Sequence, residues 1–404
     1  GWGSFLLFCA LKALHLGVFS WLAGPLLWRV YALPAIAALW VGLERTHGTF
    51  GFAWMALGNA GIDMSIPLRL APWLGVYGVS FVLVMFNVAI AGLLLRYPRK
   101  HLWPPATLLL LFLLPAIPQN IAADQHALAI QPNIDTEQVW TKDTQVQSER
   151  HLQLLSDMLH GSLVIWPEIP APFYYYSDPI FRADAEEIAR RHGNFLFGTV
   201  AYTADHQPLN SAVLLGPNGK EIGRYDKNYL VPFGEFVPPL FSFVNRISQE
   251  AGDFVPGHEI KVMQADGNRL GTFICYESAF PHLVRRFVNA GANVLINLSN
   301  DGYFGKSAAR EQHLLLVRMR AVENRRFILR VTNDGITASI DPSGQILREL
   351  PRYTEAAGLL PYGRVDTTTA YSRYGDWFAW LCLLCGIGLA LQTQLASRVR
   401  RSAS

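Results

Sequence analysis

Apolar residues are distributed unevenly along the chain and divide it into distinct parts. Long apolar runs fill residues 1–119 and 374–397, whereas residues 120–373 alternate between short apolar runs and polar stretches, as in a soluble domain. A helix that crosses a bilayer needs about 20 mostly apolar residues. The pattern therefore predicts a transmembrane helical region at 1–119, a soluble domain at 120–373, a last transmembrane helix at 374–397 and a basic cytoplasmic tail at 398–404.

Several runs are candidates for membrane spans, and one segment is ambiguous. The candidates are Ser4–Trp28, Val76–Leu95, the shorter Trp103–Ile117 and Trp377–Leu395. Residues 31–58 are interrupted by Glu44, Arg45 and His47, so this segment is either one broken span or a helix followed by a re-entrant piece. Because charges that face lipid are costly, we expect Glu44 and Arg45 to pair with each other or to line a polar cavity near the site.

Basic residues next to the spans indicate which side of the membrane each part faces. Two clusters flank spans, and they contain Arg96, Arg99, Lys100, Arg398, Arg400 and Arg401. Since such clusters stay in the cytoplasm, residues 120–373 are predicted to be extracytoplasmic. The same scheme places Gly1 outside, and the chain begins without Met or a basic leader. We therefore expect a fragment or a mature form that lacks earlier spans.

Composition argues against nucleic-acid and metal chemistry. Of the 404 residues, 16% are charged and 51% are hydrophobic, and the net charge is only +3. Soluble domains carry about 25% charged residues. The middle block has no basic cluster and no glycine-rich phosphate loop, so we expect no nucleic-acid partner and no cofactor. The histidines lack metal-ligand spacing and are interpreted as surface or loop residues in the soluble block, namely His192, His258, His282 and His313.

The cysteines separate into one isolated thiol and three in apolar segments. Cys275 is the one outside the apolar segments, so the soluble block cannot form an internal disulfide. Taken alone, it fits a buried and inert thiol. Cys382 and Cys385 have the C-x-x-C spacing but no second ligand pair, and their apolar surroundings predict helix packing.

Within residues 120–373, strand-like runs alternate with amphipathic stretches. The predicted strands are Ala127–Ile130, Leu163–Ile165, Asn194–Ala201, Ser211–Leu215, Leu270–Ile274, Asn293–Leu298, Ile328–Thr332 and Ile336–Ile340. The predicted helices lie at about 143–160, 180–192, 280–290 and 307–324. Turn residues at 217–220 and 333–335 predict two hairpins. This order predicts an α/β sandwich.

Three short strings at strand ends carry the groups needed to make and break an acyl-thioester. They are Trp166-Pro167-Glu168, Tyr225-Asp226-Lys227 and Ile274-Cys275-Tyr276-Glu277. A thiol has a pKa of about 8.5, so it needs a base or a positive field to react at neutral pH. Glu168 can accept the proton of Cys275, while Lys227 and the Tyr276 N–H can stabilise an oxyanion. Each residue alone has an ordinary structural interpretation, but their shared position at strand ends favours catalysis.

These strings resemble the nitrilase (carbon–nitrogen hydrolase) superfamily, and within it the membrane-embedded apolipoprotein N-acyltransferase family. The resemblance covers roughly residues 31–395 and includes Gln131–Ile134, Val231–Pro238, Asn297–Gly302, Arg318–Arg325 and Tyr371–Trp377. It implies an αββα sandwich inserted between transmembrane helices. Two positions depart from the family's pattern: Tyr303 stands where Trp is expected, and Lys306 stands where an acid is usual.

The resemblance also implies a role for each site residue. Cys275 would be the nucleophile, Glu168 the general base and Lys227 the oxyanion stabiliser. A second carboxylate, Glu235, would position the lysine and the acceptor. The remaining residues, Tyr276, Glu277 and Trp140, would shape the site and the substrate approach. The alternatives are core packing for Tyr276 and Trp140, a first-turn helix residue for Glu277 and a solvated loop acid for Glu235.

The implied reaction is acyl transfer in two steps. A phospholipid, with phosphatidylethanolamine as the expected donor, acylates Cys275, and the diacylglyceryl-cysteine amine of an apolipoprotein then takes the acyl chain. The implied location is a bacterial inner membrane with several spans and a periplasmic catalytic domain. Two alternatives are weighed against this function, a membrane-anchored amidase or nitrilase and a non-catalytic scaffold. The spans on both sides oppose the first, and the intact set of three residues opposes the second.

Overall fold

The computed structural model describes residues 2–49, 53–98, 104–237 and 254–402. Arg99, Lys100 and Pro238, which contribute to the predictions above, lie outside these ranges. The backbone separates into two compact units, one made of Gly1–Ile117 with Tyr374–Ser404 and one made of Pro118–Arg373. The first unit is therefore built from both ends of the chain, and the second is continuous in sequence.

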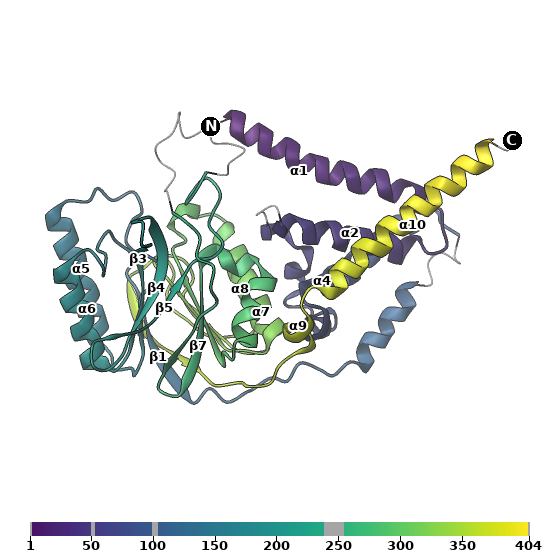
Figure 1. Cartoon of the computed structure of the whole chain (residues 1–404). Helices are drawn as coiled ribbons and strands as arrows, with labels where there is room; N and C mark the ends of the chain where they lie inside the picture. The colour runs from purple at the N-terminus through teal and green to yellow at the C-terminus, as the bar shows by residue number, and fades with distance from the viewer. Residues whose placement is uncertain (1, 50–52, 99–103, 238–253, 403–404) are drawn as a thin grey trace. The chain divides into compact units, whose positions relative to one another are not determined.

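The second unit contains two six-stranded sheets (Figure 1). The first has the order β12 (Ala356–Tyr362), β1 (Gln125–Gln131), β2 (Val164–Ile165), β3 (Phe195–Tyr202), β4 (Pro208–Leu215) and β5 (Glu221–Asp226). The second has the order β11 (Ile346–Glu349), β10 (Ala338–Ile340), β9 (Ile328–Thr332), β8 (Val294–Ser299), β7 (Asn268–Ile274) and β6 (Val262–Ala265). Both share one plan, in which three parallel central strands are flanked by antiparallel ones.

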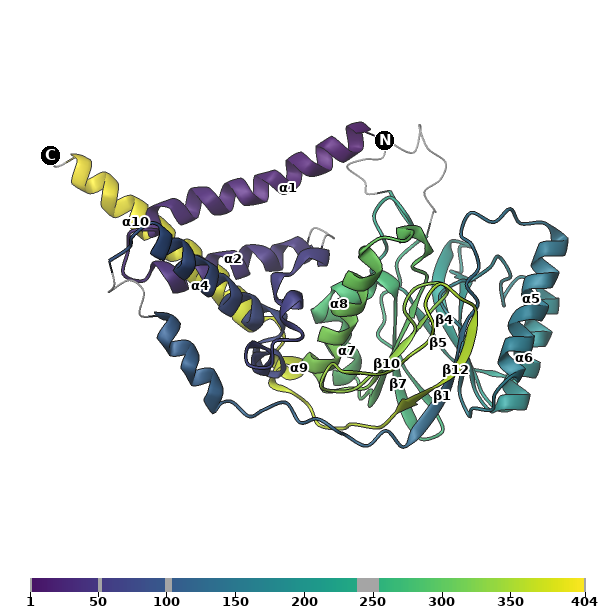
Figure 2. The same ribbon diagram turned by 180° about the vertical axis from the view of Figure 1, so that it is seen from behind.

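Helices cover the outer face of each sheet, as Figures 1 and 2 show from opposite sides. The helices are α5 (Lys142–Asp157) and α6 (Pro179–His192) on the first sheet, and α7 (Pro281–Asn289) and α8 (Ala309–Asn324) on the second. In the first half, Leu152 of α5 and Phe181 of α6 pack with Phe195 and Val213 of the sheet in one fully buried cluster. The predicted two-sheet α/β fold is confirmed.

Local sequence signals explain where the helices of this unit begin and end. The side chain of Asp178 accepts hydrogen bonds from the Ile180 and Phe181 N–H groups and so caps the start of α6, where Pro179 needs no donor partner. Gly193, with a φ of 99°, ends the same helix. Such signals lie in the sequence itself, which is why the four predicted helices agree with the structure to within a few residues.

The first unit is helical, and its main helices are α1 (Trp2–Ala23), α2 (Ala32–Thr49), α4 (Val76–Leu94) and α10 (Trp377–Ser402). Helix α1 is shorter than the expected Ser4–Trp28 because Gly24 and Pro25 start a separate 3-10 turn. The run at 103–117 contains the 3-10 segment Pro104–Leu113. In the described part of the chain, Val76–Leu94 and Trp377–Ala396 are long and apolar enough to cross a membrane.

The charged residues of α2 have partners within the helical unit. Helix α2 continues through Glu44 and Arg45 to Thr49, and the described residues after it, from Ala53, include short 3-10 turns. Arg45 forms a buried salt bridge with Asp376 next to α10, and its guanidinium lies 5.0 Å from the centre of the Trp380 ring. Glu44 accepts hydrogen bonds from the Leu57 N–H at 2.6 Å and from Trp40 at 3.3 Å. Glu44 and Arg45 therefore contact other residues of the helical unit instead of forming the ion pair with each other that was one of the two expectations.

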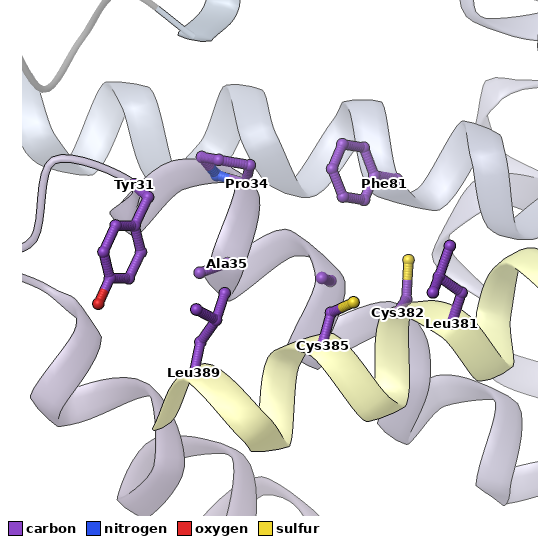
Figure 3. A pocket seen from close by; sticks show the side chains of 9 residues that line it. Tyr31, Pro34, Ala35, Phe81, Leu381, Cys382, Cys385 and Leu389 are labelled. Atoms are coloured by element: carbon purple, nitrogen blue, oxygen red, sulfur yellow. The ribbon is translucent and has the colours of Figure 1, made fainter. Parts of the chain in front are cut away.

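Helices α2, α4 and α10 border an apolar pocket of about 260 Å³, shown in Figure 3. Its lining includes Phe81 of α4 together with Cys382 and Cys385 of α10. Cys382 is buried, in line with the packing role predicted for it, whereas Cys385 lines the pocket but is exposed. Glycine allows α2 and α10 to approach closely, since a Cβ atom on Gly386 would lie 2.7 Å from the Leu39 Cα.

Candidate active site

The ends of three strands bring the predicted catalytic side chains together. Glu168 follows β2 and Lys227 follows β5 in the first sheet, whereas Cys275 follows β7 in the second. The two sheets meet at this point, because the Asn300 N–H at the end of β8 donates to Glu168 Oε2 at 3.0 Å. The site is thus assembled across the sandwich rather than within one sheet.

Lys227 lies at the centre of a buried charge network. Its Nζ donates to Glu168 Oε1 at 3.0 Å and to Glu235 Oε1 at 2.9 Å, and its side chain is 1% exposed. Asn210 Nδ2 donates to the same two oxygens, at 2.8 Å and 2.7 Å. Glu235 is fixed from its other oxygen, which accepts from the Val231 N–H at 2.8 Å. Two donors therefore hold both carboxylates in place around one ammonium group.

The charge state of this network follows from its contacts. Burial opposes a charge on Lys227, but the carboxylates of Glu168 and Glu235 outweigh it and hold the pKa of Lys227 well above its usual value. The lysine is therefore an ammonium ion at neutral pH. A buried ammonium group next to a thiol can stabilise negative charge that develops on a reacting carbonyl oxygen.

Cys275 occupies a strained turn between β7 and the 3-10 helix η8 (Cys275–Ala279). Its φ is +50°, in the left-handed region that non-glycine residues rarely adopt, and the residue is 8% exposed. Burial and then the negative charge of Glu168 raise the pKa of the Cys275 thiol above its ordinary value, while Lys227 lowers it. The resting group is thus a neutral thiol, which needs a base such as Glu168 to remove its proton during attack.

Glu277, two residues after the nucleophile, accepts hydrogen bonds from residues at the end of β5 in the first sheet and at the end of β7 in the second. Its Oε1 accepts from the Tyr225 hydroxyl and the Asn228 N–H, each at 2.7 Å, and from the Tyr229 N–H at 3.2 Å. Its Oε2 accepts from the Ile274 N–H at 2.7 Å. Burial raises the pKa of Glu277 to about 7, and these donors oppose the rise. Glu277 thus links the segment of Lys227 to that of Cys275.

The other two predicted site residues have packing contacts in the structure. Tyr276 is half-buried, and its ring meets that of Phe280 edge-on with 5.2 Å between the ring centres. Trp140 is half-buried against the core cluster of the first sheet. Their roles in shaping the site and the substrate approach remain predictions.

Sequence reasoning missed three polar residues of this region and misassigned one of them. Asn210 lies inside β4, where a single polar residue gives no motif, and Asn300 directly follows β8 within the segment Asn297–Gly302, for which no role was predicted. His313 was expected at the surface, but it is fully buried on α8, and Asp301 and the Cys275 carbonyl are its partners. His192 is also buried, at the end of α6 beside Asp157. The sequence did contain a signal for His313, since it lies on the apolar face of a predicted helix. A histidine buried there needs hydrogen-bond partners, which marks it as part of a polar cluster.

No group of three or more His, Cys, Asp or Glu side chains in the described ranges is arranged to hold a metal ion. The chemistry that this arrangement can perform is proton transfer between Glu168 and a thiol, with an adjacent ammonium group for an oxyanion. That set suits the formation and breakdown of a thioester.

Two family models match the chain, and together they cover most of it. Residues 127–372 match the carbon-nitrogen hydrolase model, and residues 1–89 match that of the apolipoprotein N-acyltransferase N-terminal domain. The chain is 37% identical over 393 residues to the apolipoprotein N-acyltransferase of Geobacter metallireducens, covering 91% of this chain and 74% of that protein. It is 33% identical over 418 residues to that of Methylococcus capsulatus, with 97% and 81% covered. Among solved structures, an amidase from Nesterenkonia sp. is similar at a TM-score of 0.45 and 20% sequence identity. The similar region covers 64% of this chain and 95% of the amidase chain.

Proposed function

The chain belongs to the apolipoprotein N-acyltransferase family, and from that premise we propose that it transfers an acyl chain to lipoproteins through a thioester on Cys275. The observation that carries this proposal is the identity of 37% to a named apolipoprotein N-acyltransferase over 91% of the chain, helical region included. An amidase would not require a match outside the catalytic domain. The buried contacts among Glu168, Lys227 and Glu235 support the same chemistry.

In the first step, the Cys275 sulfur attacks the ester carbonyl carbon of a phospholipid while Glu168 takes the thiol proton. The Lys227 ammonium, with the Tyr276 N–H, stabilises the oxyanion. The carbon–oxygen bond then breaks, Glu168 returns the proton to the leaving oxygen, and a lysophospholipid departs. The thioester on Cys275 retains the energy needed to acylate an amine.

In the second step, the free α-amine of a diacylglyceryl-cysteine attacks the thioester carbon. Glu168 takes a proton from the amine, the carbon–sulfur bond breaks, and the proton passes to the Cys275 sulfur. Glu235 shares two of its three donors, Asn210 and Lys227, with Glu168, so it holds the base in place during both steps. We propose phosphatidylethanolamine as the donor.

We propose that the enzyme spans a bacterial inner membrane several times, with residues 120–373 on the periplasmic side. Basic residues next to the predicted spans and two helices of sufficient length and apolar character support this orientation. Both substrates are anchored in lipid, and moving an acyl chain into water costs about 0.8 kcal/mol per CH₂ group. A site at the membrane surface avoids that cost.

The proposal is tested by the intact mass of the purified protein in nanodiscs after incubation with phosphatidylethanolamine. We expect a gain of one acyl chain that hydroxylamine removes, and no gain in Cys275→Ala. The matched control is Cys382→Ala, which removes a thiol from the apolar pocket of the helical unit and should leave the adduct unchanged. An adduct that persists in Cys275→Ala would contradict the assignment of the nucleophile.

A further inference from the structure

We propose that His313 is a positioning residue, which holds the carbonyl of Cys275 and thereby keeps the nucleophile in its left-handed conformation. The inference rests on the proposed function, because it concerns the same thiol. The contact between His313 and the Cys275 carbonyl, however, is present in the folded protein whatever reaction it catalyses. His313 Nε2 lies 3.0 Å from the Cys275 carbonyl oxygen, and both residues are buried. Because a carbonyl oxygen can only accept, this contact requires a proton on Nε2.

The other side of the imidazole is fixed by two charged residues. His313 Nδ1 lies 2.9 Å from Asp301 Oδ1 and 3.1 Å from Arg330 Nη2. Arg330 also bonds Asp301 Oδ2 at 2.6 Å, and Ser299 donates to Asp301 Oδ1 at 2.7 Å. The ring therefore cannot rotate without breaking its contacts to Asp301, which follows β8, and to Arg330 on β9.

These residues come from separate elements that converge behind the nucleophile. His313 is on α8, Arg330 on β9, and Ser299 ends β8, with Asp301 two residues later. Asp301, His313 and Arg330 are each fully buried in the described structure. Burial of three ionisable side chains costs folding free energy. Such buried clusters often occur at functional sites, where they fix the geometry of neighbouring groups.

The purpose follows from the backbone at Cys275. A non-glycine residue stays at a φ of +50° only when its surroundings over-determine that conformation. Glu277 holds the preceding residue, through the Ile274 N–H, and His313 holds the carbonyl of Cys275 itself. The nucleophile is thus anchored from both sides, and removal of one anchor lets the sulfur leave its attack position.

Two substitutions separate the contact with Cys275 from the contact with Asp301. In His313→Gln, the side-chain amide nitrogen can take the place of Nε2 and donate to the Cys275 carbonyl. In His313→Asn, the shorter amide can take the place of Nδ1 and reach Asp301 alone. His282→Asn is the control, because His282 is a half-buried histidine on α7 that bonds Tyr229.

The first measurement is the rate of thioester formation with phosphatidylethanolamine, together with the donor concentration at half-maximal rate. A misplaced reacting group costs on the order of 100-fold in rate. We expect a loss of about that size in His313→Asn with an unchanged half-maximal concentration, a loss within about 10-fold in His313→Gln, and none in His282→Asn. Equal losses in both His313 variants, or no loss in either, would overturn the proposal.

The second measurement is thermal unfolding, which is independent of acyl transfer and so tests the proposal even if the proposed function is wrong. Glycine adopts the left-handed conformation without strain, whereas alanine is strained there as cysteine is. We expect His313→Asn to lower Tm less in a Cys275→Ala background than in a Cys275→Gly background, because only the alanine variant recovers strain energy when residue 275 relaxes. Equal reductions in the two backgrounds would show that the histidine is an ordinary part of the core.

Discussion

A single buried lysine, Lys227, balances two carboxylates and acts electrostatically on the thiol of the site. It is the cation that Glu168 and Glu235 share, at 3.0 Å and 2.9 Å. Its charge also lowers the pKa of Cys275, against the effects of burial and of Glu168. The lysine thus has two separable effects, one on the resting thiol and one on the oxyanion.

Replacement of Lys227 by methionine should expose both effects. Without the ammonium group the pKa of the thiol rises further, so at any pH below that pKa less thiolate is present. We expect alkylation of Cys275 by iodoacetamide to slow at pH 8, and thioester formation to fall by a factor of about 100 to 1,000, as for loss of an oxyanion donor. Mass spectrometry of the labelled peptide reports the first and intact mass the second. An unchanged thioester yield would show that other groups hold the oxyanion.

At the scale of elements, the predictable parts of this fold are those with a local signal. The helices carry caps and amphipathic faces, and the pairing of Ile328–Thr332 with 336–340 carries a turn between two apolar runs. Strands β6, β11 and β12 were not predicted, because apolar and polar residues do not alternate in their sequences, VMQA, ILRE and AAGLLPY. Their pairing is decided by distant partners, as for β12 beside β1.

The contact between α5 and α6 has a pH dependence of its own. Burial, and then the neighbouring Asp184 of α6, raise the pKa of Glu149 on α5 to about 7 from an ordinary value of 4.5. Between pH 4.5 and pH 7, Glu149 is therefore protonated in the folded state and ionised in the unfolded state. The stability that this proton provides is present below pH 4.5 and is lost as the pH rises to 7.

Glu149→Gln should flatten this dependence, because an amide has no proton to lose. We expect the variant to be more stable than the parent at pH 8, by about 1–2 kcal/mol, and to differ little at pH 5. Thermal unfolding at the two pH values measures the effect. Glu186→Gln is the control, since Glu186 bonds Arg190 at the surface of α6. A pH dependence that is the same in Glu149→Gln and the parent would rule out this carboxyl as its source.

Over the whole molecule, the sequence predicted candidate catalytic residues but not the polar side chains that bond to them. Glu168, Lys227 and Cys275 follow strands and form part of short motifs, so each could be named in advance. Asn210 could not, because it is a single polar residue whose partners lie 25 and 42 positions away in sequence. The position of His313 on a helix face indicated burial, but its partners come from other elements. The salt bridge between Arg45 and Asp376 was missed for the same reason, since 331 positions separate the two residues.

The contact between α2 and α10 can be tested with two glycines of one helix. A Cβ atom on Gly386 would lie 2.7 Å from the Leu39 Cα, whereas one on Gly388 would meet nothing within 4 Å. We expect Gly386→Ala to destabilise the helical unit by about 1–3 kcal/mol, because the helices must move apart. Gly388→Ala should be neutral or slightly stabilising. Unfolding in detergent compares the two, and equal effects would mean that the close approach contributes nothing.

The pairing of α2 with α10 also fixes the order in which the protein can be built. The helical unit needs residues from Tyr374 onward, and the whole segment Pro118–Arg373 is synthesised before them. At about 5–20 residues per second, a ribosome takes on the order of 10–50 s over that segment. During this interval Arg45 has no access to Asp376, and the face of α2 that will meet α10 has no contact with that helix. The first helices therefore lack the stabilising contacts of α10 until synthesis of the chain is almost complete.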